Sequence, residues 1–330
     1  MRKLIGLSLF GVVLLLGLSG WMFWQITAPH QPEQAVELEI PKGASTIKIG
    51  RLLQEQGVIT SKLAFRIAAR LKGVSSGLKS GLYHFTDPAS ISTIIKRLEK
   101  GDVMKFQVTV PEGLRNDEII TLLASKTEIK AEVWQAELNK LLPGMADGWL
   151  LPETYQYTKP LNPAELLRSM MKAQQVVLNA LSSDPAVQQQ LRIAASIIEK
   201  ETMLDHERPL VSAVIRNRLA KRMPLQMDPT VIYGIWKTTG SFSGDIRKRD
   251  LSADTPWNTY TRRGLPPTPI GNPGAASLKA AAAPADVDYL FFVADGTGGH
   301  KFAATHEGHL ANVEQWIRIE RQKNSSGSKK

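Results

Sequence analysis

An uncharged apolar run near the start of the chain decides where the rest of it can fold. Residues 4–24 carry no charge and follow Met1-Arg2-Lys3. About 20 consecutive apolar residues cross a bilayer, so this run predicts a transmembrane helix. A cleaved signal peptide has a shorter apolar core, of about 7–15 residues, and a small-x-small cleavage site. This run is longer and ends in Trp21, Phe23 and Trp24, which favours a retained anchor.

The charges at the start of the chain orient this anchor. Arg2 and Lys3 hold the short N-terminal end in the cytoplasm under the positive-inside rule. We therefore expect everything after Gln25 to lie outside the inner membrane. The net charge of +10 favours an anionic neighbour. The extracytoplasmic position argues against nucleic acid as that partner, and the sequence holds no zinc-finger, RNP or recognition-helix pattern.

The composition of the 330-residue chain is that of a globular protein without covalent crosslinks. Hydrophobic residues make up 43% and charged residues 22%, so we expect disorder only at the ends and in short linkers. A chain of this length predicts two or three folded units. Cysteine is absent, which excludes disulfides, thiolate metal sites, cysteine nucleophiles and cysteine-linked lipid anchors.

Behind the anchor, the sequence predicts a mixture of strands and helices. Residues 27–35 contain two prolines and form a short extended linker. Residues 36–40 alternate as a half-buried strand, and a Pro-x-Gly turn leads into a helical pattern. The same strand, turn and helix recur from residue 106. Each copy loosely resembles a LysM-like module, which holds N-acetylated glycans, and a plain βα packing unit is the alternative.

Two glutamates stand at the end of a predicted helix at residues 191–202. At helical spacing Glu201 shares a face with Ile197 and Ile198, whereas Glu199 lies on the more polar side. A carboxyl group on an apolar face loses hydration, which raises its pKa and lets it donate a proton near neutral pH. Glu201 is therefore the candidate general acid. The alternative is a helix end of ordinary charge, with Glu201 in a buried salt bridge.

Two later segments carry amide and aromatic side chains. Gln226 offers a donor and an acceptor, which recognition of a sugar acetamido group requires. Asn258 and Tyr260 supply a further amide and a further aromatic ring, and a rigid proline-rich loop at 264–274 follows them. That loop suits either binding or scaffolding. Asp228 precedes a proline, which predicts a helix start with Asp228 as its N-cap.

The histidines and the glycine-rich segment do not indicate a metal or a cofactor. His300, His306 and His309 lie close together in sequence, but no HExxH helix or other known ligand pattern accompanies them. Residues 296–299 follow a predicted strand and lack the Walker lysine-serine ending. They therefore predict a hairpin tip rather than a phosphate loop.

Four motifs carry a family resemblance. Behind a single N-terminal anchor, the chain resembles the endolytic murein transglycosylase family, MltG or YceG-like, in IIEKET (197–202), LQMDPTVIYGI (225–235), NTYTRRGLPPTPIGNPG (258–274) and YLFFVADGTGGHKF (289–302). The resemblance implies cleavage of peptidoglycan within its glycan strands, on the outer face of the bacterial cytoplasmic membrane. In that family the second glutamate of the EKE run is the catalytic acid, which is Glu201 here. Thr202 looks like the hydroxyl residue that helps to orient the carboxyl group.

The implied reaction is that of a lytic transglycosylase. Protonated Glu201 donates to the oxygen between N-acetylmuramic acid and N-acetylglucosamine, then accepts the proton of the muramic 6-hydroxyl as a 1,6-anhydro ring closes. Thr202, Gln226, Asn258 and Tyr260 are the expected substrate-binding residues. The resemblance also suggests cell-wall synthases as partners. One alternative is a lysozyme-type hydrolase, with Asp228 or Asp205 as the candidate second carboxylate. The other is a non-enzymatic glycan-binding scaffold.

The expected fold class is α+β, with an N-terminal transmembrane helix, a LysM-like βα subdomain and an α+β catalytic domain. We expect the following segments: a cytoplasmic stub and anchor at 1–26, a linker at 27–35, the LysM-like subdomain at 36–105, a second α+β unit at 106–190 that leads into the catalytic domain, the catalytic core at 191–322 and a disordered tail at 323–330.

Overall fold

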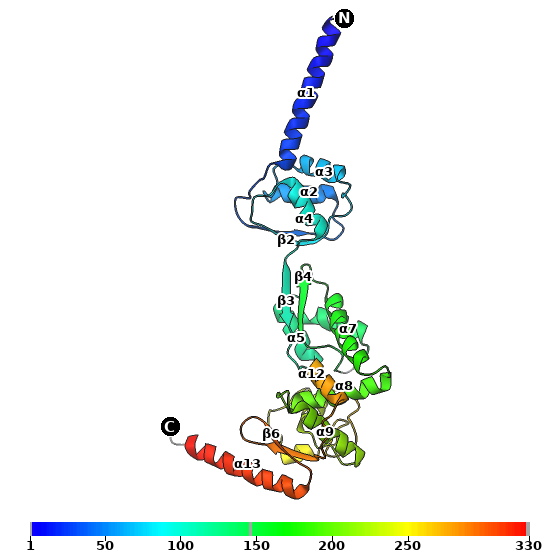
Figure 1. Cartoon of the computed structure of the whole chain (residues 1–330), viewed down its shortest axis with the longest axis vertical. Coiled ribbons are helices and arrows are strands. Elements are labelled where there is room, and N and C mark those ends of the chain that lie inside the picture. Colours follow the sequence, from blue (N-terminus) through cyan, green and yellow to red (C-terminus); the bar gives the residue numbers. More distant parts are fainter. Residues whose placement is uncertain (1, 145–146, 328–330) are drawn as a thin grey trace. The chain divides into compact units, whose positions relative to one another are not determined.

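The structure is a computed structural model that describes residues 2–144 and 147–327 (Figure 1). Over these residues it is a mixed α+β fold, mostly helical, whose strands form two-stranded sheets. The expected α+β class is confirmed. The chain forms two compact units: unit 1 is Met1–Gln107 with Gln156–Asn162, and unit 2 is Val108–Tyr155 with Pro163–Lys330. The finer segments expected from the sequence stay predictions.

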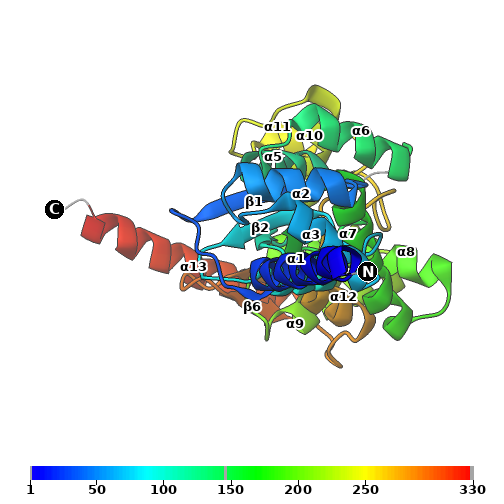
Figure 2. The same cartoon turned by 90° about the horizontal axis from the view of Figure 1, so that it is seen from above.

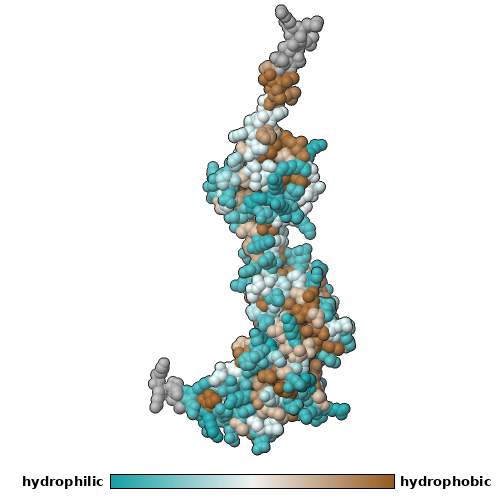
Figure 3. Space-filling model, in the orientation of Figure 1, coloured by the Kyte–Doolittle hydropathy of each residue, from teal (hydrophilic) through white to brown (hydrophobic). Residues whose placement is uncertain are grey.

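Unit 1 begins with the long helix α1 (Arg2–Thr27). Large apolar side chains stay exposed on its described part, from Phe10 (68% exposed) to Phe23 (69%). Figure 3 shows a brown patch on this helix next to the grey atoms. Among the residues that the structure describes, no helix combines the length and apolarity that a membrane crossing needs. The anchor at 4–24 stays a prediction, and Met1 lies outside the described residues.

The rest of unit 1 packs three helices on a small sheet. Strand β1 (Val36–Ile40) pairs antiparallel with β2 (Gly81–Phe85), and its burial alternates as the sequence predicts. Helix α2 (Thr46–Glu55) contacts β1 and lies beside the sheet in Figure 2. Helices α3 (Lys62–Leu71) and α4 (Ile91–Lys100) complete the core. A serine hydroxyl caps each helix by accepting a backbone N–H of the first turn, which fixes where it starts.

The two units divide within a strand pair. Strand β3 (Lys105–Thr109) pairs with β4 (Thr154–Thr158), and the division falls inside both strands. The strand predicted at 106–110 is confirmed, but it begins and ends one residue earlier than predicted.

Unit 2 is built around α8 (Pro185–Glu201), whose last residues are the glutamate motif. Ile197 and Ile198 of α8 are fully buried in its core. Helices α7, α9, α10 and α12 contact α8. The other elements are α5 (Asn116–Thr127), α6 (Ala131–Leu141), α7 (Pro163–Leu181), α9 (Arg208–Ala220), α10 (Asp228–Thr239), α11 (Lys248–Leu251), α12 (Ala275–Ala282), β5 (Phe291–Ala294), β6 (His300–Ala303) and α13 (His306–Gly327).

Two boundaries at the end of unit 2 bear on the sequence predictions. Strand β5 pairs antiparallel with β6, with Ala294 opposite His300, so the predicted hairpin tip at 296–299 is confirmed. Helix α13 continues to Gly327. The described part of the expected disordered tail, 323–327, is therefore helical, and residues 328–330 lie outside the described residues.

The predicted N-cap of α10 is wrong. The helix begins at Asp228 and its N-cap is Met227. The Met227 backbone N–H donates to Thr259 Oγ1 at 3.0 Å, and the Thr230 hydroxyl donates to the Met227 carbonyl at 2.6 Å. These contacts fix the helix start without an aspartate cap. They leave the Asp228 carboxylate available for other partners.

Candidate active site

Glu201 is the last residue of α8, on the face that carries Ile197 and Ile198 into the core. Its Oε1 atom is out of contact with solvent and has no hydrogen-bond partner among the described residues. The pKa of Glu201 is raised to about 8; burial is the largest cause, the charge of Asp228 adds to it, and the charge of Arg218 opposes both. The apolar face therefore produces the raised pKa that the helical pattern predicts. This carboxyl group is protonated at neutral pH.

Asp228 and Tyr260 form a hydrogen-bonded pair near this carboxyl group. The Tyr260 hydroxyl donates to Asp228 Oδ1 at 2.5 Å. Burial, the hydrogen bond and the charge of Asp228 raise the pKa of Tyr260, so its hydroxyl stays protonated. Asp228 itself is exposed. The negative charge of the exposed Asp228 side chain thus lies close enough to act on Glu201.

Arg218 of α9 places a buried cation near the same group. Its guanidinium donates to the Leu225 and Leu290 carbonyls, both at 2.6 Å, so its position is fixed by backbone. Arg218 and Asp228 act in opposite directions on the pKa of Glu201. The carboxyl group can therefore stay protonated at rest and still tolerate a negative charge after it gives up its proton.

Glu199 takes a different position. Its side chain is only 5% exposed, and it pairs with Arg208 at 3.5 Å and accepts the Gly274 N–H at 2.9 Å. The carboxylate has charged and backbone partners, but it is buried among them rather than exposed. Glu199 therefore holds the 271–274 backbone against α8.

Thr202 does not contact the Glu201 carboxyl group through any hydrogen bond of the described residues. It is buried, its hydroxyl donates to Glu207 Oε2 at 2.9 Å, and its oxygen accepts the Leu204 N–H at 3.1 Å. Its contacts fix the end of α8. The hydroxyl thus makes anchoring contacts with Glu207 and Leu204, and the orienting or substrate-binding role expected of Thr202 stays a prediction.

Glu207 was not apparent from the sequence. Its carboxylate accepts the His300 backbone N–H and the His300 ring Nδ1–H, each at 2.7 Å, besides the Thr202 hydroxyl. Burial raises the pKa of Glu207, but the hydrogen bonds from His300 and Thr202 outweigh it, and the pKa falls below its ordinary value. The ionised carboxylate ties β6 to the end of α8, directly beyond Glu201.

Asn258, expected to contact substrate, is fully buried. Its amide donates to the Leu251 and Ala253 carbonyls at 3.0 and 2.7 Å, and its Oδ1 accepts the Tyr260 N–H at 2.8 Å. Both N–H groups of the amide are engaged, and full burial keeps the whole side chain out of reach of a sugar. Asn258 instead shapes the loop that presents Tyr260 to Asp228.

Gln226 is the predicted substrate residue that stays open to solvent. Its side chain is exposed and makes no hydrogen bond to the part of the chain that the structure describes. Its backbone has a φ of 50°, which non-glycine residues rarely adopt, and its N–H donates to the Thr259 carbonyl at 3.1 Å. An accessible amide thus stands two residues before Asp228 in the chain.

Comparison with known proteins agrees with the four motifs. Residues 38–315 match the YceG-like family. A protein of Bacillus subtilis (strain 168) named endolytic murein transglycosylase is 31% identical over 316 residues, which cover 87% of this chain and 86% of that protein. A protein of the same name from Streptococcus pneumoniae serotype 2 (strain D39 / NCTC 7466) is 27% identical over 322 residues, covering 86% of this chain but 58% of that protein.

A solved structure supports the same assignment. The crystal structure of a YceG-like protein from Listeria monocytogenes matches with a TM-score of 0.53 and 29% identity, covering 84% of this chain and 99% of that chain. The family match extends over most of the described residues of both units. The distant relatives of this chain are named endolytic murein transglycosylase, and the chain belongs to the YceG-like family.

Proposed function

We propose that this protein is an endolytic lytic transglycosylase that cleaves the bond between N-acetylmuramic acid and N-acetylglucosamine within nascent peptidoglycan strands. The names of its relatives support the substrate and the reaction class. The observation that carries the mechanism is the buried carboxyl group of Glu201, whose pKa is raised to about 8. A general acid of this kind works near neutral pH because it still holds its proton there.

The first half of the reaction needs a proton donor at the glycosidic oxygen. Glu201 donates its proton as the bond breaks, and positive charge develops at the anomeric carbon of the muramic residue. Asp228 supplies a nearby carboxylate that favours this charge, and the Tyr260 hydroxyl holds that carboxylate in place. Arg218 favours the Glu201 carboxylate that remains after proton transfer.

The second half of the reaction needs a proton acceptor, and the carboxylate of Glu201 takes this role. Ionised Glu201 removes the proton of the muramic 6-hydroxyl, whose oxygen then bonds to the anomeric carbon and closes the 1,6-anhydro ring. Glu201 ends the cycle protonated, so no water is consumed. Gln226 is the proposed contact for a sugar acetamido group, because its amide is the open one.

A lysozyme-type hydrolase is the second candidate, and Asp228 favours it. Hydrolysis requires a second carboxylate that acts as nucleophile or activates water. Asp228 is exposed and lies close enough to raise the pKa of Glu201. The chemistry of the product ends separates the two reactions, because only hydrolysis adds water.

Asp228→Asn should move the alkaline limb of the activity profile to lower pH. The negative charge of Asp228 raises the pKa of Glu201, so its removal lets Glu201 lose its proton earlier as pH rises. Cleavage rates measured across neutral and mildly alkaline pH report this limb. Asp254→Asn is the matched control, since Asp254 is an exposed aspartate that pairs with Arg262 instead. An unmoved limb in Asp228→Asn would remove Asp228 from the site.

We also propose that residues 4–24 anchor the protein in the bacterial cytoplasmic membrane, with the remainder outside. The uncharged sequence and the exposed apolar side chains of α1 support this placement. Deleting residues 1–24 should release the protein from the membrane fraction, because no comparable apolar run remains. Fractionation with an antibody to the chain measures this. Retention of the truncated chain in the membrane would rule out the anchor as the main attachment.

The βα unit at 36–105 is proposed as a LysM-like glycan-binding element, and its strand, turn and helix support this. Cell-wall synthases are proposed as partners, because enzyme and synthase would act on the same new strands. A non-enzymatic scaffold would keep its glycan binding and release no cleaved product, whichever residue stands at 201.

A further inference from the structure

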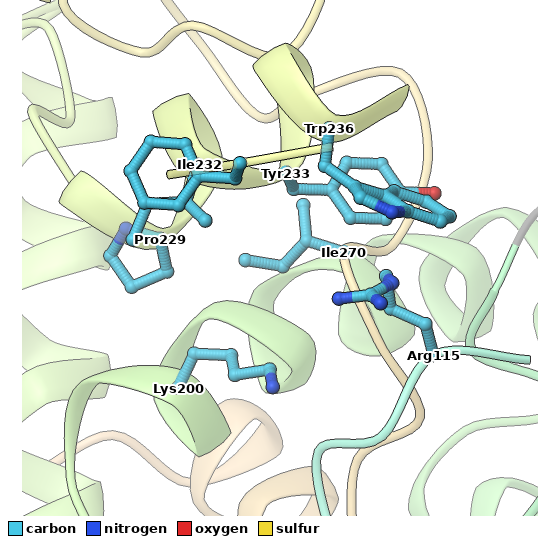
Figure 4. A pocket seen from close by; sticks show the side chains of 8 residues that line it. Arg115, Lys200, Pro229, Ile232, Tyr233, Trp236 and Ile270 are labelled. Atoms are coloured by element: carbon cyan, nitrogen blue, oxygen red, sulfur yellow. The ribbon is translucent and has the colours of Figure 1, made fainter. Parts of the chain in front are cut away.

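A pocket of about 370 Å³ opens between α8 and α10 (Figure 4). Lys200 directly precedes Glu201 and Pro229 directly follows Asp228, so the lining lies one residue from each acid along the chain, and neither acid lines the pocket. Trp236 lines its far end along α10. The full lining is Arg115, Lys200, Pro229, Ile232, Tyr233, Trp236, Phe242 and Ile270.

Lys200 contributes a positive charge that the described part of the chain does not neutralise. It is exposed and makes no ion pair or hydrogen bond with the described residues. Its Cε lies 3.5 and 3.6 Å from the points where a Cβ would stand at Gly113 and Gly271. A Cβ at Gly271 would also lie only 2.6 Å from the Gly113 carbonyl oxygen. Because Gly113 and Gly271 have no side chains, the aliphatic part of Lys200 can pass close to their backbones on its way to the pocket.

Arg115 adds a second cation, part of which is free. Its Nε and Nη2 bind Asp117 at 3.0 and 3.2 Å, and Nη2 also pairs with Glu118 at 3.1 Å. Its Nη1 has no partner among the residues described. The guanidinium carbon lies 4.0 Å from the centre of the Trp236 ring. That face of the indole is therefore covered, and a sugar ring cannot stack on it.

The remaining lining argues against a neutral ligand. The Tyr233 hydroxyl donates to Asp147 Oδ2 at 2.7 Å, so it is not available to the pocket. Pro229, Ile232 and Ile270 offer only apolar surface. The open polar groups of the lining side chains are thus the ammonium of Lys200 and one arm of Arg115, both of which are cationic donors. A ligand with a carboxylate and small apolar groups fits this combination.

We propose that the pocket binds the acidic stem peptide that peptidoglycan carries on its N-acetylmuramic acid residues. A peptide carboxylate pairs with Lys200 and Arg115, and alanyl methyl groups pack on Ile232 and Ile270. The inference rests on the proposed function, because it places the muramic residue beside Glu201. From Pro229 to Trp236, α10 rises by about 10 Å at about 1.5 Å per residue. About three residues of extended peptide cover that length.

A ratio of two kcat/KM values, measured with the full-length chain, tests this proposal. The numerator is kcat/KM on uncrosslinked strands that bear peptides. The denominator is kcat/KM on the same strands after an amidase has removed the peptides. Lys200→Met should lower this ratio about 10-fold, which is about 1.4 kcal/mol, because the substitution removes the charge-assisted hydrogen bond to the peptide carboxylate. Most of the loss should appear in KM. Lys200→Arg keeps the charge and should restore the ratio, which a purely structural role would not require.

Lys221→Met is the matched control, since Lys221 is an exposed lysine of the same unit that does not line the pocket. Its ratio should equal that of the wild type. An unchanged ratio in Lys200→Met would overturn the proposal while the proposed function stands. A wild-type protein that cleaves neither kind of strand would overturn the proposed function and this inference with it.

Discussion

Glu201→Gln should lower the rate of peptidoglycan cleavage by about 10³-fold or more, within or above the range by which general acid–base groups accelerate reactions. The substitution keeps the size of the side chain and removes its transferable proton. The same group acts as acid and then as base in the proposed reaction, so both steps lose their catalyst. Anhydro product released from purified strands, followed over time, measures the rate.

Glu199→Gln is the matched control for this variant, two residues away on the same helix. An amide at 199 can still accept the Gly274 N–H, but it removes the charge that faces Arg208. We therefore expect substantial activity and a lower melting temperature. An inactive Glu199→Gln together with an active Glu201→Gln would transfer the acid role to the other glutamate. Loss of activity in both variants at unchanged stability would require the two carboxyl groups to act together.

Glu201→Gln should also become more stable than the wild type as pH rises. The pKa of Glu201 is raised from 4.5 to about 8 in the folded protein. Between these values the unfolded chain has lost the proton and the folded chain still holds it. The free energy of unfolding of the wild type therefore falls as pH rises through this window. The amide has no proton to lose, so it escapes this fall.

The size of this effect follows from the pKa shift. The rise of the pKa from 4.5 to about 8 corresponds to a loss of at most about 5 kcal/mol in the free energy of unfolding. Denaturant unfolding of both proteins at about pH 5 and about pH 9 measures the difference on either side of the window. A stability difference that is the same at both pH values would mean that Glu201 ionises normally in the folded protein.

The local patterns of the chain were predictable from sequence because they depend on near neighbours. The alternation at 36–40 predicts β1 and its buried face, and the 3.6-residue period places Glu201 over Ile197 and Ile198. Both follow from backbone geometry alone. The raised pKa of Glu201 also follows, since the apolar face of a helix is the face that packs into a core.

The partners of polar side chains were not predictable, because they come from distant segments. Asn258 was singled out as an amide suited to sugars, but the turn around it uses that amide internally. Thr202 adjoins Glu201 in sequence and yet binds Glu207, whose other partner, His300, lies on β6. The sequence offered one local signal for Glu207, namely its position shortly after the end of the helix that carries Glu201.

The start of α10 shows the same limit on a smaller scale. Asp before Pro is a good N-cap signal, and it failed because Thr259 accepts the Met227 N–H. The aspartate that the pattern assigned to capping instead pairs with Tyr260 beside Glu201. Because Thr259 accepts the Met227 N–H, Asp228 is not needed as an N-cap, and its carboxylate can accept the Tyr260 hydroxyl instead.

Mass spectrometry of peptidoglycan digested by the full-length protein, in water labelled with heavy oxygen, tests the proposed reaction most directly. Closure of the ring by the muramic 6-hydroxyl predicts 1,6-anhydro ends that are one water lighter than reducing ends and carry no label. Cleavage within strands predicts that these ends appear on fragments of intermediate length. Reducing ends that carry the label would contradict the transglycosylase reaction and would assign the protein as a hydrolase, with Asp228 as its second carboxylate.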